Sequence, residues 1–292
     1  MSQIRANGIN IEYEEKGERH HPSLVLVRGL GTQLIDWPTQ FIETLVAAGF
    51  HTVCFDNRDV GLSQKFDQAG VPDLAAVLNG DEEPPYTLQD MADDVIGVMD
   101  TLNIDKAHVL GISMGGMIVQ VLAATHGARL LGMISVMSTS SRPGLPPATP
   151  EAMASLTAQP DPAGGDEAID QLTAQGLEIC GSPGYPQSLD ERLMIARRRR
   201  QRNYNPAGVA RQFAAVSAYG SRVELLTSIN LPCLVIHGAE DPLIPVSGGE
   251  DTAQCIADCD LEIIPGMGHN IPDGVVPILA KFIVDFCHRI VS

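Results

Sequence analysis

Six short runs of apolar, strand-forming residues are spread through the 292-residue chain, and helix-like segments lie between them. The runs cover residues 23–29, 51–56, 106–112, 131–137, 232–238 and 260–266. Continuous apolar runs of this length suit parallel strands that are buried on both faces of a sheet. The alternation of strands and helices therefore predicts repeated β–α–β units and a doubly wound, mostly parallel α/β sheet.

The segments between the runs carry apolar residues at helical spacing. We expect helices at about 36–48 and 88–102, another directly after Ser113, and a last amphipathic helix near the end of the chain. Thr87 is followed three residues later by Asp90, which is the spacing that marks the start of a helix.

The alternation stops between about residues 143 and 228. This stretch opens with several prolines and continues as three helical segments, at about 165–180, 189–203 and 206–220, with no candidate strand. We therefore expect a core domain made of residues 1–143 and 228–292, with residues 144–227 inserted as a helical cap, or lid. Such an insertion would lie over the carboxyl ends of the strands, where α/β proteins bind ligands.

The charge of the chain argues against two classes of partner. The formal net charge is −17, whereas nucleic-acid binding requires clustered Lys and Arg. The same acidity disfavours docking on anionic membranes. No window reaches the 18 apolar residues of a membrane span, and the first residues lack the apolar stretch of a signal peptide. We therefore expect a cytoplasmic protein that binds neither nucleic acid nor membrane.

The six cysteines are scattered and show no C-x-x-C spacing. Cys54 and Cys233 lie inside apolar runs, where cysteine acts as a small hydrophobic residue. Cys255 and Cys259 would share a helical face, but no histidine lies near them in sequence. We expect six reduced thiols, no metal and no cofactor; a secreted, disulfide-bonded protein is the alternative.

The sequence Gly-Ile-Ser-Met-Gly at residues 111–115 follows one predicted strand and precedes a predicted helix. This context is the one that a nucleophile elbow requires, because the tight turn projects the serine hydroxyl away from the sheet. Glycines at 111 and 115 remove side chains that would collide across such a turn. An ordinary glycine-flanked turn is the alternative interpretation of Ser113.

A serine hydroxyl needs a base, and that base needs a carboxylate to orient it. Among the eight histidines, we expect only His269 to reach Ser113, because it follows the last strand in a glycine-rich loop. Asp241 lies just past the strand at 232–238 and is the expected acid, with the adjacent Glu240 as the alternative. The order serine, aspartate, histidine is that of the α/β hydrolases.

An acyl-transfer site also needs two N–H donors for the developing oxyanion. The residue after the nucleophile, Met114, supplies one of them. The loop after the strand at 23–28 supplies the other, from Leu30, and Gly29 lets this loop approach closely.

These motifs resemble the α/β-hydrolase superfamily over essentially the whole chain. The matching segments are RGLG, DNRDVGLS, GISMGGM, GAEDP and GMGHN. DNRDVGLS, SMGGM and the cap segment NPAGVARQFAAV resemble most closely the esterase and methylesterase branch that includes aclacinomycin methylesterase. Many members of the superfamily have His before the oxyanion-loop glycine, where this chain has Arg28. We expect Arg28 to pair with a nearby carboxylate such as Asp56 or Asp59.

The resemblance implies acyl transfer, because related dehalogenases and epoxide hydrolases carry Asp in place of the nucleophilic serine. We expect a carboxylesterase that cleaves a small or medium carboxylic ester through an acyl-enzyme. Hydrolysis of a lactone or a carbon–carbon bond, perhydrolysis, and non-catalytic binding of a small molecule are the alternatives. The sequence predicts neither the natural ester nor the oligomeric state.

Several cap and loop residues are candidates for the substrate pocket. We expect Gly29, Trp37 and Phe213 to line it, with Tyr219 as a further aromatic candidate. Three methionines either line a deformable apolar cavity or fill the core: Met114, Met117 and Met137. The arginine-rich run at 196–202 should point mostly to solvent, with one of its members or Arg211 contacting an anionic substrate as the alternative.

Overall fold

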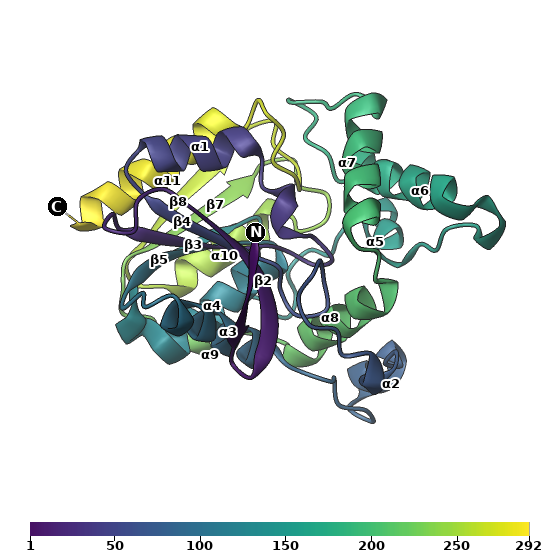
Figure 1. Cartoon of the computed structure of the whole chain (residues 1–292), viewed down its shortest axis with the longest axis horizontal. Helices are drawn as coiled ribbons and strands as arrows, with labels where there is room; N and C mark the ends of the chain where they lie inside the picture. Colours follow the sequence, from purple (N-terminus) through teal and green to yellow (C-terminus); the bar gives the residue numbers. More distant parts are fainter. Residues whose placement is uncertain (292) are drawn as a thin grey trace.

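The computed structural model describes residues 1–291, which form a sheet flanked by helices with a helical projection at one end (Figure 1). Within these residues the sheet has eight strands in the order β1-β2-β4-β3-β5-β6-β7-β8. Strands β3 to β8 pair in parallel, and β1 and β2 pair antiparallel at one edge. The strand bounds are β1 (Ser2–Ala6), β2 (Ile9–Lys16), β3 (Ser23–Val27), β4 (His51–Phe55), β5 (Ala107–Ile112), β6 (Leu130–Val136), β7 (Cys233–Gly238) and β8 (Cys259–Ile264).

All six predicted strands are present, and the prediction of a mostly parallel α/β sheet is confirmed. Strands β1 and β2, in residues 2–16, were not predicted from the sequence. In β2, polar residues such as Glu12 and Glu14 alternate with apolar ones, which is typical of an antiparallel strand and not of a buried parallel one. The parallel strands were recognisable because they are continuously apolar, and this alternating hairpin was not.

Helices cover both faces of the sheet. One face packs against α3 (Leu88–Thr101), α4 (Met114–His126) and α10 (Val246–Cys255). The other packs against α1 (Thr39–Ala47) and α11 (Val276–Val291). The short helix α2 (Leu74–Asn79) lies further along the chain from β4. No helix in residues 1–291 is long and apolar enough to cross a membrane.

Two of the helix predictions can be compared with the observed starts. The capping box at the start of α3 is confirmed, because the Thr87 hydroxyl accepts the Asp90 N–H and the Asp90 carboxylate accepts the Thr87 N–H. The helix expected at 36–48 begins only at residue 39. Pro38 separates it from a 3₁₀ turn at Leu34–Asp36, because proline cannot donate to a preceding turn of helix.

The chain between β6 and β7 is helical, with α5 (Pro150–Thr157), α6 (Gly165–Ile179), α7 (Leu189–Arg202), α8 (Pro206–Tyr219) and α9 (Val223–Thr227). Helices α5 to α7 project from one end of the sheet, and α8 lies below them in this view, beside α2 (Figure 1). Helix α9 packs against α4 and α10. The cap boundaries at 143/144 and 227/228 stay a prediction, and we propose that α5 to α8 form the cap.

Candidate active site

Ser113 lies in a sharp turn between β5 and α4. Its backbone has φ of 56° and ψ of −122°, a strained conformation for a residue with a side chain. A Cβ on Gly111 would lie 2.0 Å from the Gly115 carbonyl oxygen, and one on Gly115 would lie 2.2 Å from the Val27 carbonyl oxygen. Both glycines are therefore needed where they stand, because the backbone segments approach too closely for any side chain.

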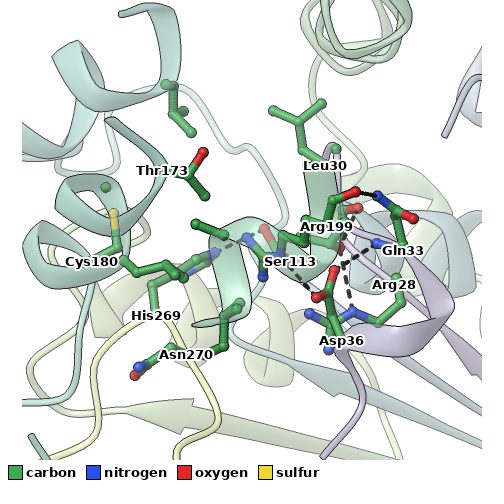
Figure 2. A pocket seen from close by; sticks show the side chains of 18 of the residues that line it. Arg28, Leu30, Gln33, Asp36, Ser113, Thr173, Cys180, Arg199, His269 and Asn270 are labelled. Atoms are coloured by element: carbon green, nitrogen blue, oxygen red, sulfur yellow. Dashed lines mark hydrogen bonds and ion pairs between the residues drawn. The ribbon is translucent and has the colours of Figure 1, made fainter. Parts of the chain in front are cut away.

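Three side chains from separate loops meet beside this turn. The Oγ of Ser113 lies 2.9 Å from Nε2 of His269, and Nδ1 of His269 lies 2.6 Å from Oδ2 of Asp241. Asp241 follows β7, and His269 follows β8. Figure 2 shows the His269 ring directed at Ser113. The structure thus brings together the serine, histidine and aspartate that the sequence singled out.

The Asp241 carboxylate is fixed by several donors. Its Oδ1 accepts the backbone N–H groups of Leu243 and Ile244, at 2.9 and 2.8 Å. Burial alone would raise the pKa of the Asp241 carboxyl, but the neighbouring His269 and His237 and the Ile244 N–H outweigh burial and hold that pKa well below its ordinary value. Asp241 is therefore ionised at neutral pH.

His237 is a site residue that the sequence analysis missed. Its Nε2 donates to the Ile244 carbonyl at 2.8 Å and lies 3.5 Å from Oδ2 of Asp241. Its place inside β7 concealed this role, although the spacing of four residues to Asp241 was visible. Glu240, the alternative acid, accepts the Gly266 N–H at 2.6 Å, and within residues 1–291 the His269 ring bonds to Asp241 instead.

The loop that carries His269 is bonded to the cap. The His269 N–H donates to the Cys180 carbonyl at 2.8 Å, and the Gly268 N–H donates to the Ser182 hydroxyl at 2.9 Å. The Gly184 N–H donates to the Gly266 carbonyl at 2.9 Å. A Cβ on Gly184 would lie 2.7 Å from the Gly266 Cα, so the two backbones touch.

Met114 and Leu30, the two residues expected to bind an oxyanion, belong to segments that lie next to Ser113. Met114 is the first residue of α4, and Leu30 lines the same cavity as Ser113 and His269. In residues 1–291 neither N–H donates a hydrogen bond. A Cβ on Gly29 would lie 3.0 Å from Cβ of Ser113, so glycine permits the close approach of the Leu30 loop.

A cavity of about 1380 Å³ lies between the strand ends and the cap, with Ser113 and His269 in its wall. Gly29 and Phe213 line it as expected, and so do the three methionines Met114, Met117 and Met137. The cap side is mainly apolar and includes Met153, Leu156, Ile169, Leu172, Leu177 and Ile195.

The prediction that Trp37 lines the pocket is wrong. The Trp37 side chain is buried in the core, where it stacks on Phe41 with ring centroids 5.6 Å apart. The indole thus packs against a residue of α1, and Trp37 is not among the residues that line the cavity. Tyr219 also packs against the core, on the side of α3 and α4.

The expected pairing of Arg28 with Asp56 or Asp59 is also wrong. The Arg28 guanidinium lies over the Trp37 ring, 4.7 Å from its centroid, and Nε of Arg28 lies 3.4 Å from the Thr32 hydroxyl. Burial lowers the pKa of Arg28 to about 10, although the charge of Asp36 opposes the shift. Asp56 and Asp59 instead form ion pairs with Arg202 and Arg211 of the cap.

The sequence predicted that the arginine-rich run at 196–202 points mostly to solvent, and this prediction is wrong. Arg199 binds Asp36 at 2.8 Å, and Arg202 binds Asp56 at 2.7 Å, so both join the cap to the core. Arg200 binds Asp170 at 2.7 Å within the cap. Buried carboxylates attract these side chains, because an unpaired buried charge is costly. Only two arginines of the run, Arg197 and Arg198, have side chains that are more than half exposed.

Arg211 is not available to an anionic substrate. Its Nε and Nη2 bind the two oxygens of Asp59 at 2.8 and 2.7 Å, and its side chain is 1% exposed. This bidentate pair joins α8 of the cap to the loop after β4. In residues 1–291, no group of three or more His, Cys, Asp or Glu side chains is arranged to hold a metal ion.

Comparison with known families gives a match over most of the chain. The family model described as alpha/beta hydrolase fold matches residues 22–273. Rhodomycin D methylesterase DauP of a Streptomyces species is 27% identical over 96% of this chain and 95% of its own length. The 3-oxoadipate enol-lactonase 2 of Acinetobacter baylyi is 26% identical over 89% of this chain and 87% of its own.

Solved structures give the same fold. The enol-lactonase of Burkholderia xenovorans superposes with a TM-score of 0.74 at 26% identity, over 98% of this chain and 99% of its own. The meta-cleavage product hydrolase CumD of Pseudomonas fluorescens superposes with a TM-score of 0.77 at 20% identity, over 99% of this chain and 98% of its own. The second likeness concerns the fold alone.

Proposed function

Because the chain belongs to the α/β hydrolase fold family and is a hydrolase, we propose that it cleaves a small-molecule carboxylic ester through a serine acyl-enzyme. The observation that carries the proposal is the hydrogen-bonded chain Ser113–His269–Asp241, with distances of 2.9 and 2.6 Å. A serine, a base and an orienting acid in this geometry are the requirements for nucleophilic acyl transfer.

The charge state of Asp241 assigns the proton on His269. An ionised carboxylate 2.6 Å from Nδ1 accepts a hydrogen bond from an N–H at that nitrogen, so the ring proton sits on Nδ1 and the lone pair of Nε2 is free to accept the Ser113 proton. Ser113 Oγ then attacks the ester carbonyl, and the N–H groups of Leu30 and Met114 bind the oxyanion. His269 returns the proton to the leaving alcohol, and water releases the acid in a second, equivalent step.

The cavity supports a bulkier ester than the sequence analysis expected. Its volume of about 1380 Å³ exceeds the roughly 300–1,000 Å³ of ordinary ligand pockets. The apolar wall of the cap favours a hydrophobic acyl or alcohol part. Lactone hydrolysis by the same three residues is the second candidate, since the enol-lactonases resemble this chain in sequence and fold.

The first test is turnover of p-nitrophenyl acetate and butyrate, followed by a series of methyl esters of increasing size and a panel of lactones. We expect Ser113→Ala to lower kcat/KM by at least ~10³-fold. Ser138→Ala is the matched control, because this buried serine follows the neighbouring strand β6 and its hydroxyl has no hydrogen-bond partner among residues 1–291. Equal activity of Ser113→Ala and the wild type would refute the assignment of the nucleophile.

A further inference from the structure

Leu30, the expected oxyanion donor, lies between Gly29 and Gly31. Glycine imposes little preference on its own φ and ψ, and Gly31 has φ of +65°. A Gly-Leu-Gly segment therefore does not fix the direction of the Leu30 N–H by itself. That direction must be imposed by contacts on the two peptide groups beside Leu30, because a preorganised donor gives its benefit only when it already points at the oxyanion.

The peptide group before Leu30 is held from within the core loop. The Gly29 carbonyl accepts the Thr32 hydroxyl at 2.8 Å and the Thr32 N–H at 3.3 Å. These two bonds fix the carbonyl end of the peptide whose other end is the Leu30 N–H.

The peptide group after Leu30 is held from the cap. The Gly31 N–H donates to Oε1 of Gln212 at 2.9 Å, and these residues are 181 positions apart in the chain. Nε2 of Gln212 donates to the Arg58 carbonyl at 2.8 Å, and the Gln212 side chain is fully buried. Both ends of the amide are therefore used, which leaves its carbonyl oxygen in one orientation, toward Gly31.

The helix that carries Gln212 is itself anchored beside the loop. Val209, one turn earlier on α8, faces Gly31, where a Cβ on the glycine would lie 3.0 Å from the valine Cγ2. Arg211 binds Asp59 through two bonds, and Asn205 donates to the Asp59 carbonyl at 2.8 Å. Helix α8 thus presents Gln212 to Gly31 from a fixed position.

We propose that Gln212 is a positioning residue for catalysis: it holds the Leu30–Gly31 peptide so that the Leu30 N–H points at the oxyanion. The inference rests on the proposed serine hydrolase function. It assigns to the cap a part in stabilising the transition state, in addition to forming the wall of the cavity. Gln212 does not contact the substrate in this role and acts only through the Leu30 loop.

Gln212→Met tests the proposal, because methionine keeps the length and nearly the volume of glutamine and removes both hydrogen bonds. Loss of one oxyanion donor typically lowers kcat by ~10²–10³-fold, and a misdirected donor should cost less. We expect kcat for p-nitrophenyl butyrate to fall about 10- to 100-fold, with KM changed less than about threefold.

A trifluoromethyl ketone with the same alkyl chain gives a second readout. Ser113 adds to this ketone to form a hemiketal whose oxyanion occupies the same place as that of the ester intermediate. We expect its inhibition constant to rise by the same factor as kcat falls. A loss of packing around the cavity would instead raise KM and the inhibition constant of a non-reactive alkyl alcohol analogue.

Arg192→Met is the matched control, because it removes a hydrogen bond to the Gln187 carbonyl and an ion pair with Glu178 inside the cap but leaves α8 and the Gly31–Gln212 bond in place. We expect it to lower the melting temperature and to leave both kcat and the inhibition constant of the ketone within about threefold of the wild-type values. Should Gln212→Met fail to fold, Gln212→Asn retracts the amide by about 1.5 Å and carries the same expectation.

Wild-type kcat and wild-type ketone affinity in a folded Gln212 variant would overturn the inference and leave the proposed function standing. Absence of ester turnover in the wild type, together with no labelling of Ser113 by a fluorophosphonate, would overturn the proposed function itself.

Discussion

The two walls of the cavity are built in different ways. On the core wall, Ser113, Asp241 and His269 follow strand ends, and short local turns set their directions. On the cap wall, Arg199, Arg202 and Arg211 join segments that are far apart in the chain, such as Arg211 and Asp59, 152 positions apart. The comparison teaches that the reactive side chains are placed mainly by turns at the strand ends, with the His269 loop also bonded to the cap, whereas the cap is joined to the core mainly by paired charges.

Asp241→Asn should produce the largest effect, and it acts on the core wall alone. An asparagine at this position still accepts the backbone N–H groups but no longer holds the Nδ1 proton of His269. We expect kcat to fall about 10⁴-fold, with a melting temperature close to that of the wild type. Turnover of p-nitrophenyl butyrate and a thermal melt provide the two measurements.

Glu240→Gln is the matched control for this change, since the adjacent carboxylate accepts the Gly266 N–H while the His269 ring is bonded to Asp241. Its activity should remain within a few fold of the wild type. Full activity in Asp241→Asn, or a large loss in Glu240→Gln, would move the acid to residue 240.

Arg211→Met should produce the next largest effect, on the cap wall. The substitution leaves the Asp59 carboxylate buried without its bidentate partner, and breaking a buried pair in this way costs about 3–5 kcal/mol. Equilibrium unfolding in urea measures the loss. Arg197→Gln removes a mostly exposed arginine 3.8 Å from Asp170 and should change the free energy of unfolding by less than about 0.5 kcal/mol. Similar losses in both variants would contradict the role given to the buried pair.

The smallest expected effect is a change with pH in the free energy of unfolding that Arg211→Met costs. Burial alone would raise the pKa of Asp59, but hydrogen bonds from Arg211, Phe66 and Tyr86 outweigh it, so the pKa lies below its ordinary value. A carboxyl with a lowered pKa stabilises the fold above the unfolded pKa of about 4 and loses that contribution as the pH falls below it.

In Arg211→Met the main cause of the lowered Asp59 pKa is absent. The difference in unfolding free energy between wild type and variant should therefore shrink between pH 6 and pH 3.5, by about 1.4 kcal/mol for each unit of pKa change. Urea unfolding at several pH values measures it. A difference that stays constant with pH would show that Asp59 and Arg211 are not coupled.

The sequence was sufficient for the parallel sheet, the elbow at Ser113 and the candidate partners Asp241 and His269. Each of these depends on short segments whose residue types reveal their conformation, such as a glycine pair around a serine or a loop directly after an apolar strand. The hairpin β1–β2 was missed because its alternating pattern is weak beside the continuous apolar runs.

The sequence was insufficient for the cap wall. Trp37 was assigned to the pocket and lies in the core, and Arg28 was paired with carboxylates that Arg202 and Arg211 occupy. Gln212 gave no indication of its contact with Gly31. The contacts of Arg202, Arg211 and Gln212 join segments that come together only after the whole chain has folded, so no local pattern predicts them. His237 lies only four residues from Asp241, and that spacing was overlooked.

The touching backbones of Gly184 and Gly266 have a consequence for protein engineering. Exchanging the cap for that of another hydrolase is an obvious route to a new substrate range. In this protein such a graft would also replace the groups that bind the backbone around His269, and a bulkier residue at position 184 would push that loop away from the serine. A chimera should therefore keep residues 180–184 from the original chain and vary only the apolar segments that face the ligand.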